Sequence, residues 1–252
     1  NMIKSLERYD PDGRLSGTVN LSNIYTEPMI LGELTATGVT SGKEAIGKIH
    51  LAGRYNIKKK FALLQTGSGI FRSTSSMTLS GAFGIDSTNA GKVRGNIQFN
   101  SAPLAWLSPF LQDYVSDLGG TLNGVVQLRG ATAAPNISGE VSLSNATVHV
   151  DYLGTSYMIP KAGISVDNQR ISIDRVTLKD QYNNEAVLTG GIRHEHLRDF
   201  VLQLRLTSDK FEVVNLKEHE SHNFYGHLIA KVSSMSVTGP VNDIRMSIQA
   251  TP

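Results

Sequence analysis

One short phrase recurs along most of the chain: a glycine, followed by apolar residues at the second and fourth positions after it. The phrase begins at eight glycines, which are Gly17, Gly32, Gly47, Gly81, Gly95, Gly124, Gly139 and Gly226. Most of the intervals between them lie near one or two units of about 15 residues, which is typical of a repeated structural unit. The chain is therefore expected to repeat one element many times.

The spacing inside each phrase indicates the type of that element. Apolar residues at every second position predict a strand with one apolar and one polar face. Turn-forming letters such as SN, TG and NAG stand where the alternation stops. About sixteen strands are expected by this criterion, and a sheet of that length must curl, split or close because neighbouring strands are twisted against each other. The predicted fold is all-β, a long curled and mostly repetitive sheet that forms an open hydrophobic groove.

One segment departs from the alternation. In SAPLAWLSPFLQDYVSDL, residues 101–118, the apolar residues recur at steps of three and four, which predicts an amphipathic helix. Pro109 would start a second helical piece of about ten residues, and Gly119 with Gly120 would end it. The expected organisation is a β-groove block over residues 1–100, an insertion over residues 101–118 whose helix lies near 103–118, and a second β-groove block over residues 119–252.

Composition excludes several classes of protein. The 252 residues carry 24 basic and 22 acidic side chains, a net charge of +2, which gives no argument for a nucleic-acid partner. There are no cysteines, so neither disulfides nor a thiolate metal site can form. No apolar run is long enough to cross a membrane, and the first ten residues lack the apolar core of a signal peptide. We expect a soluble piece of a longer chain.

Motifs of enzymes and cofactor sites fail on inspection. The sequence has no G-x-S-x-G elbow, and its GSG and AGKV stretches lack the remaining residues of a dinucleotide turn or a phosphate loop. Carboxylates at strand ends are expected to be surface charge; they are Asp174, Asp180, Glu185 and Asp199. Two histidine pairs lack a visible third ligand; they are His194 with His196 and His219 with His222. We therefore predict no enzyme, no cofactor and no metal.

A basic run, RYNIKKK over residues 54–60, allows two interpretations. Its lysines could meet lipid headgroups, or they could be solvated side chains that keep a strand edge from pairing, and the second is the more usual role of such lysines.

Two stretches resemble the TamB family of AsmA-like proteins. The first, GTLNGVVQLRGATAAPNISGEVSLSNATV, is similar to the repeat of that family. The second, residues 209–252, resembles the C-terminal domain of its Bacteroidetes homologues, with matches at Phe211, Asn215, Phe224, Tyr225, Gly226 and Thr238-Gly239-Pro240. The resemblance covers residues 119–252. Over residues 1–118 only the general style of the repeat is similar.

The resemblance implies a location and a role. Proteins of this kind are anchored in the inner membrane by an N-terminal helix, absent here, and cross the periplasm of Gram-negative bacteria as a curled sheet, or β-taco, with an apolar groove. They are similar in build to bridge-like lipid transfer proteins, support outer-membrane biogenesis, and pair with a BamA-like barrel, TamA. The present chain would then be a periplasmic segment whose groove carries the acyl chains of phospholipids between the two membranes.

The groove would be lined by the inward residues of successive strands. The candidates are Val19, Leu21, Leu34, Ile49, Leu51, Phe83, Ile85, Ile97, Phe99, Val126, Leu128, Val141, Leu143 and Leu228. Three other interpretations stay open. Alternating residues also build the filled core of a sandwich. The sheet edge could receive a strand from a client protein or from a TamA-like barrel, as a scaffold for outer-membrane protein assembly. Repeated strands also build β-helix enzymes, although no aligned catalytic cluster is visible.

Overall fold

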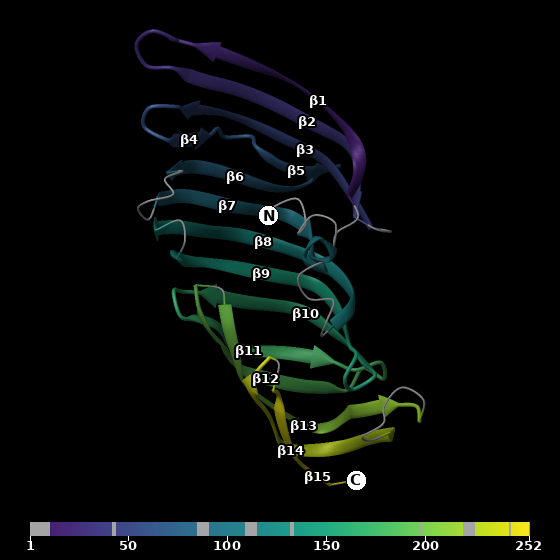
Figure 1. Cartoon of the computed structure of the whole chain (residues 1–252). Helices are drawn as coiled ribbons and strands as arrows, with labels where there is room; N and C mark the ends of the chain where they lie inside the picture. The colour runs from purple at the N-terminus through teal and green to yellow at the C-terminus, as the bar shows by residue number, and fades with distance from the viewer. Residues whose placement is uncertain are drawn as a thin grey trace. The chain divides into compact units, whose positions relative to one another are not determined.

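The computed structural model describes residues 11–41, 44–84, 91–108, 115–131, 134–196, 198–218, 225–241 and 243–251. In these residues the chain forms 15 strands of a single antiparallel sheet, in which almost every strand lies beside its neighbours in sequence (Figure 1). Each of the eight glycine phrases begins inside a strand. The all-β prediction is therefore confirmed, and so is the repeat as a series of strands.

The strands range from four to nineteen residues. The first seven are β1 (Pro11–Ser22), β2 (Met29–Ser41), β3 (Glu44–Asn56), β4 (Phe61–Leu64), β5 (Gly69–Arg72), β6 (Ser75–Gly84) and β7 (Lys92–Pro103). The other eight are β8 (Val115–Ala131), β9 (Ala134–Val150), β10 (Thr155–Val166), β11 (Arg170–Lys179), β12 (Glu185–Glu195), β13 (Arg198–Leu216), β14 (Gly226–Pro240) and β15 (Arg245–Thr251). The short strands β4 and β5 both pair with β3 and β6.

The chain divides into two compact units. Unit 1 consists of Asn1–Ala102 and Asn123–Gly139, and unit 2 consists of Pro103–Leu122 and Glu140–Pro252. The boundary runs through β8 and β9, each of which contributes residues to both units.

In unit 1 the pairing of strands lines up apolar side chains on one face of the sheet. Residues that pair across an antiparallel ladder share a face, so a chain of pairs traces a row across the strands. One such row runs from Leu21 through Ile30, Tyr55, Ala62 and Phe83 to Val93. A parallel row on the same face runs from Leu15 through Ala36, Ile49, Ile70 and Met77 to Phe99. The strands of unit 1 thus present one continuous apolar face.

Glycines form a row of their own between those two. From β1 to β7 the pairing runs from Val19 through Gly32, Gly53, Leu64 and Gly81 to Gly95. At Gly81, with a φ of 145°, an added Cβ would lie 2.4 Å from the Cα of Gly95 on the next strand. A side chain cannot fit at that distance, so this close approach of two strands requires glycine.

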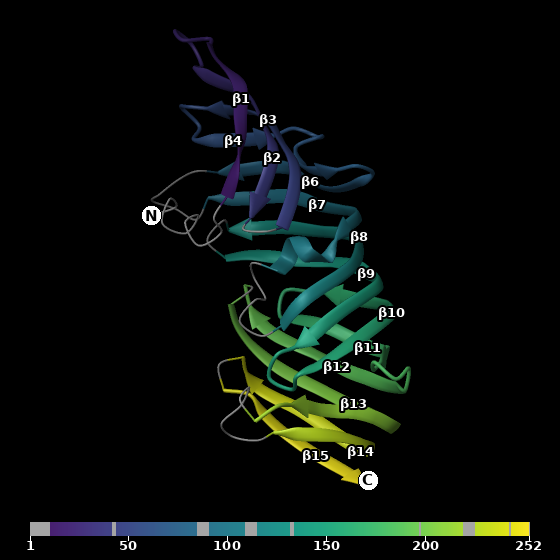
Figure 2. The ribbon, with the colours of Figure 1, turned by 90° about the vertical axis from the view of Figure 1, so that its right-hand side faces the viewer.

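In unit 2 the sheet curls back on itself (Figure 2). Strands β10 and β13 are separated by β11 and β12 in the sheet order, yet they contact each other. The ring of Tyr157 on β10 stacks on the ring of Phe211 on β13 with centroids 5.0 Å apart, and the amide N of Asn215 donates to the carbonyl O of Leu153 at 2.9 Å. This closure encloses a filled apolar interior that includes Val176 and Val213.

The helical prediction for residues 101–118 is partly wrong. A 3-10 helix spans Leu104–Leu107 and buries Leu104 and Trp106. Residues 109–114 lie outside the described residues, but Val115 already belongs to β8, so residues 115–118 are strand rather than helix. Contacts with residues 146–151 of the same chain outweigh the helical spacing. The Oγ of Ser116 donates to Oδ1 of Asp151 at 2.6 Å, and Gly120 lies against Ala146 of β9.

Candidate functional site

The apolar face of unit 1 is open to solvent. On β1, Leu15, Val19 and Leu21 expose 72%, 67% and 54% of their surface, and all three lie on this face by register. Leu34 and Leu51, which pair with each other on β2 and β3, are exposed as well. Buried apolar side chains in the described part of unit 1 are few: Val93, Ala102 and Ile137. Aligned, exposed apolar side chains in such number are typical of a binding surface.

An apolar hollow of about 430 Å³ lies on this face. Its lining comes from five strands, β1, β2, β3, β4 and β6, and includes Val19, Leu34, Leu51, Tyr55, Leu64 and Phe83. Two glycines, Gly32 and Gly53, belong to the lining and lower its floor because they carry no side chain. Such a surface can hold a flexible apolar ligand, and its lining offers a polar side chain only at Arg54 and Tyr55.

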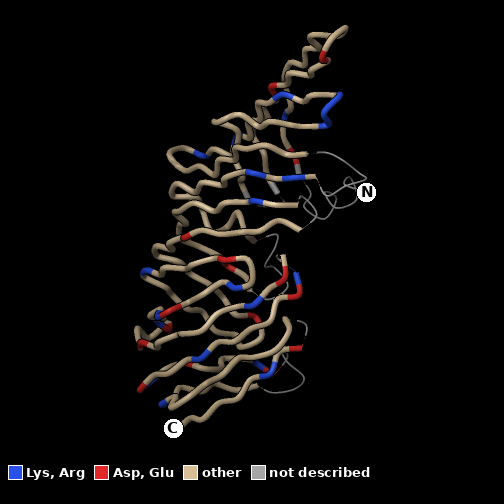
Figure 3. The backbone as a smooth tube through the Cα atoms, turned by 90° about the vertical axis from the view of Figure 1, so that its left-hand side faces the viewer, with Lys and Arg blue, Asp and Glu red and all other residues tan. Residues whose placement is uncertain are grey.

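The opposite face of unit 1 is polar. Its cross-strand rows include Ser16–Thr35–His50 and Thr78–Gln98, and the side chain of Thr35 is hydrogen-bonded to Nδ1 of His50 at 3.2 Å. Arg14, Arg54 and Arg94 lie on it by register, and Figure 3 marks the lysines and arginines of unit 1 in blue. The described residues of unit 1 contain ten lysines and arginines but four aspartates and glutamates. The sheet of unit 1 is therefore amphipathic, with an apolar side and a basic, polar side.

The fourteen predicted lining residues separate into groups. Val19, Leu34, Leu51 and Phe83 line the hollow. Leu21, Ile49, Ile97 and Phe99 lie on the same face by register. Ile85 lies outside the described residues. Val126 and Leu128, on β8, belong to unit 1 and are half-buried. Val141, Leu143 and Leu228 belong to unit 2, where Leu143 is part of the buried interior.

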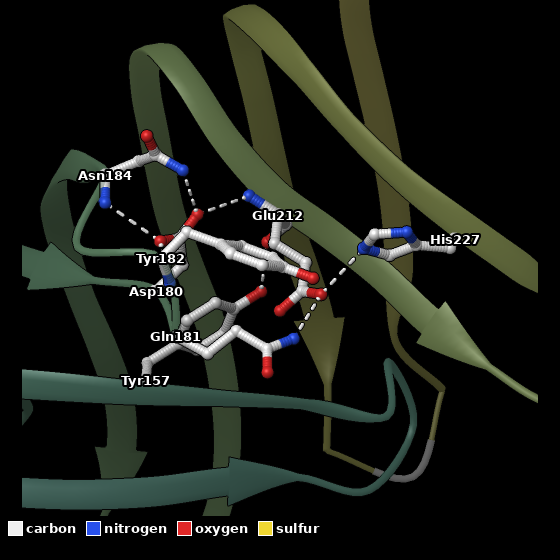
Figure 4. A network of polar contacts seen from close by, with 7 residues as sticks. All are labelled: Tyr157, Asp180, Gln181, Tyr182, Asn184, Glu212 and His227. Atoms are coloured by element: carbon white, nitrogen blue, oxygen red, sulfur yellow. Dashed lines mark hydrogen bonds and ion pairs between the residues drawn. The ribbon is translucent and has the colours of Figure 1, made fainter.

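Unit 2 holds a polar network that the sequence did not reveal (Figure 4). Glu212 on β13 is 0% exposed, and its Oε1 accepts from Nε2 of Gln181 at 2.6 Å and lies 2.9 Å from Nε2 of His227. Its backbone N–H donates to Oδ2 of Asp180 at 3.0 Å. The network joins the β11–β12 turn to β13 and β14, and so fastens the closure of unit 2.

Asp180 is the centre of the turn in this network. The prediction of surface charge is wrong for this residue, because its side chain is buried. Burial alone would raise the pKa of Asp180, but hydrogen bonds from the side chain of Asn184 and from the N–H groups of Glu212, Asn184 and Tyr182 outweigh it and hold the pKa below its ordinary value. The carboxylate therefore stabilises the fold above its ordinary pKa, and this contribution disappears as the pH falls through the lowered value.

Tyr157 contributes from the other side of the closure. Its hydroxyl donates to the carbonyl O of Glu212 at 3.1 Å. Burial is the main cause that raises the pKa of Tyr157 to about 12, with smaller contributions from the charges of Glu212 and Asp180. Only Oε2 of Glu212 has no hydrogen-bond partner among the described residues of this network. The arrangement is that of a structural clasp that links β10, the β11–β12 turn and β13.

Neither a metal site nor a membrane-crossing helix is found in the described parts of the chain. Nowhere in them do three His, Cys, Asp or Glu side chains converge in a way that could hold an ion. His219 and His222 lie outside those parts. The described helical residues form no span long and apolar enough to cross a membrane.

No protein-family model, no curated protein and no solved structure matches the chain. The function must therefore be argued from geometry.

Proposed function

We propose that the open apolar face of unit 1 binds the acyl chains of lipids and passes them along the sheet. The observation that carries this proposal is the alignment of exposed apolar side chains in rows across β1–β7, with the hollow between Val19 and Phe83. An ordinary soluble domain would bury such a face against another layer.

The energetics suit this ligand. Transferring an acyl chain through water costs about 0.8 kcal/mol for every methylene group exposed, so a carrier must offer apolar contact along the whole chain. The two rows supply such contact from Leu15 and Leu21 on β1 to Phe99 on β7, and neither row contains a charged residue. Affinity would rise with the length of the acyl chain, because each further methylene group adds apolar contact.

The biological setting follows the resemblance. As a TamB-type segment, the protein would act in the periplasm, within a longer chain anchored in the inner membrane, and carry phospholipid toward the outer membrane. The partnership with a BamA-like barrel, and a strand exchange with it, rest on the resemblance alone.

Photocrosslinking tests the proposal one residue at a time. A photoreactive amino acid at Val19 or Leu34 should yield phospholipid adducts in Gram-negative cells, because both positions lie on the apolar face. Thr18 and Glu33 are matched controls, since they pair with each other on the opposite face and are adjacent in sequence to those positions. Equal labelling at all four positions, or protein adducts alone, would refute lipid carriage by this face.

A further inference from the structure

Two neighbouring turns at one end of the unit 1 sheet are bound together into a single tip. We define the tip as residues 23–28, between β1 and β2, and residues 57–60, between β3 and β4 (Figure 1). The amide N of Ile57 donates to the carbonyl O of Pro28 at 3.0 Å, and Nδ2 of Asn56 donates to Oε1 of Glu27 at 3.0 Å. Nζ of Lys59 lies 2.7 Å from the same carboxylate oxygen, and Nζ of Lys58 donates to the carbonyl O of Thr26. The two turns are therefore linked by three hydrogen bonds and an ion pair.

The tip displays apolar side chains that the fold does not use. Tyr25 is 98% exposed and Ile24 is 60% exposed, and Ile57 and the adjoining Phe61 are also exposed. Turns normally carry small polar residues, so a tyrosine and two isoleucines at the ends of hairpins need another explanation. An aromatic ring beside aliphatic side chains is typical of protein segments that lie at the boundary between water and lipid.

Positive charge surrounds these side chains. Lys58, Lys59 and Lys60 occupy the second turn, against a single carboxylate, Glu27, in the described residues of the tip. Lys92 and Arg94, at the start of β7, lie at the same end of the sheet, because Val93 pairs with Phe83 and the next residue, Gly84, pairs with Phe61. Figure 3 shows the turn between β3 and β4 in blue. Each lysine or arginine near an anionic membrane surface strengthens binding by about fivefold.

We infer that the tip docks on the surface of an anionic lipid bilayer, with Ile24 and Tyr25 inserted among the headgroups and Lys58–Lys60 facing the lipid charge. The tip joins exposed aliphatic and aromatic side chains to lysines, and an anionic bilayer provides a partner for both, in its acyl region and in its charged headgroups. This inference goes beyond the proposed function and does not depend on it, since the tip lies at the strand ends and the hollow lies on the sheet face.

Vesicle flotation of the full chain tests the inference. Vesicles of phosphatidylcholine with about 30% phosphatidylglycerol, in about 0.1 M salt, should carry the protein, and vesicles of phosphatidylcholine alone should carry it far less. The combined variant Lys60→Gln, Lys92→Gln, Arg94→Gln removes three exposed charges at this end of the sheet while keeping the contacts of Lys58 and Lys59 inside the tip, and it should bind roughly 100-fold more weakly. The pair Ile24→Ser, Tyr25→Ser should reduce binding by roughly tenfold. Raising the salt about fivefold should release the unmodified protein, a readout that no folding defect can imitate.

A charge-matched control keeps the test specific. Lys161→Gln, Lys210→Gln, Lys231→Gln removes the same charge from exposed positions of unit 2 and should leave binding within about threefold. The inference fails if this control loses as much as the tip variant, or if neutral vesicles bind equally well. The tip variants should retain binding of a fluorescent fatty acid, so failure of tip docking and failure of acyl-chain binding can be told apart.

Discussion

The two units contain the same glycine phrase, but they differ in whether their apolar side chains are exposed or buried. Unit 1 leaves residues of its apolar face exposed, such as Leu15, Leu34 and Leu51, whereas unit 2 buries Leu153, Val176, Phe211 and Met235 in a closed interior. The alternation is common to both, so it determines that a strand has two faces but not what covers the apolar one. Closure in unit 2 comes from additional groups, namely the stacked rings of Tyr157 and Phe211 and the carboxylates of Asp180 and Glu212.

The largest expected effect is a loss of stability specific to unit 2. Phe211→Ala removes a side chain that is 1% exposed and should lower the free energy of unfolding by about 3–5 kcal/mol, because it leaves a cavity beside Tyr157. Leu15→Ala, on the open face, should cost less than about 1 kcal/mol. Chemical denaturation followed by the fluorescence of Trp106, the single tryptophan and a buried residue of unit 2, measures the difference. Equal losses would show that the open face is also a packed core.

The next effect is a dependence on alkaline pH. Because the pKa of Tyr157 is raised to about 12, the hydroxyl loses its proton at a lower pH in the unfolded chain than in the folded chain. Unit 2 should therefore lose about 3 kcal/mol of stability as the pH rises from the ordinary pKa of tyrosine to the raised pKa of Tyr157. The stabilisation is complete below about pH 10. Tyr157→Phe should cost about 1 kcal/mol near neutrality for the lost hydrogen bond and flatten the alkaline decline. Tyr25→Phe, in an exposed turn of unit 1, is the control and should leave the pH profile unchanged.

A smaller effect is expected on ligand binding by unit 1. Leu34→Asp places a charge in the hollow and should weaken the binding of a fluorescent fatty acid by about tenfold, since the carboxylate would have to lose its water against an acyl chain. Thr18→Asp adds the same charge to the opposite, polar face and should leave affinity unchanged. Fluorescence titration of both variants provides the comparison. A loss in Thr18→Asp that matched the loss in Leu34→Asp would indicate that charge acts through general repulsion.

Much of the fold could be predicted from the sequence because its signals are local. The period-two alternation and the turn letters identified the strands, and the register of unit 1 places Leu21, Ile49 and Phe99 on one face as predicted. The closure of unit 2 could not be predicted in this way. It depends on bulges in β13, between Ser208 and Phe211, and on a contact between Tyr157 and Phe211, which are far apart in sequence.

The same limit explains two errors at the level of residues. Residues 115–118 carry helical spacing, but pairing of their strand beside β9 decides their conformation. Asp180 stands among turn letters and looks like surface charge, and only the folded chain brings the N–H of Glu212 to it. The resemblance covers residues 119–252, most of which belong to unit 2, while the open face lies in unit 1. The alternation alone is equally that of a filled sandwich core, so the expectation of an open face came from the resemblance, although that face lies outside most of the residues that the resemblance covers.

Gly32 is a position in the hollow at which a side chain can be added by substitution. It belongs to the lining, yet a Cβ built on it would meet no atom within 4 Å, unlike one on Gly17, which would lie 2.3 Å from the carbonyl O of Glu33. A bulky residue at position 32 can thus fill part of the hollow without straining the backbone, and an environment-sensitive dye attached there would report whether the hollow is occupied. Position 32 is therefore suited to a side chain that blocks the hollow or to a dye that reports on it.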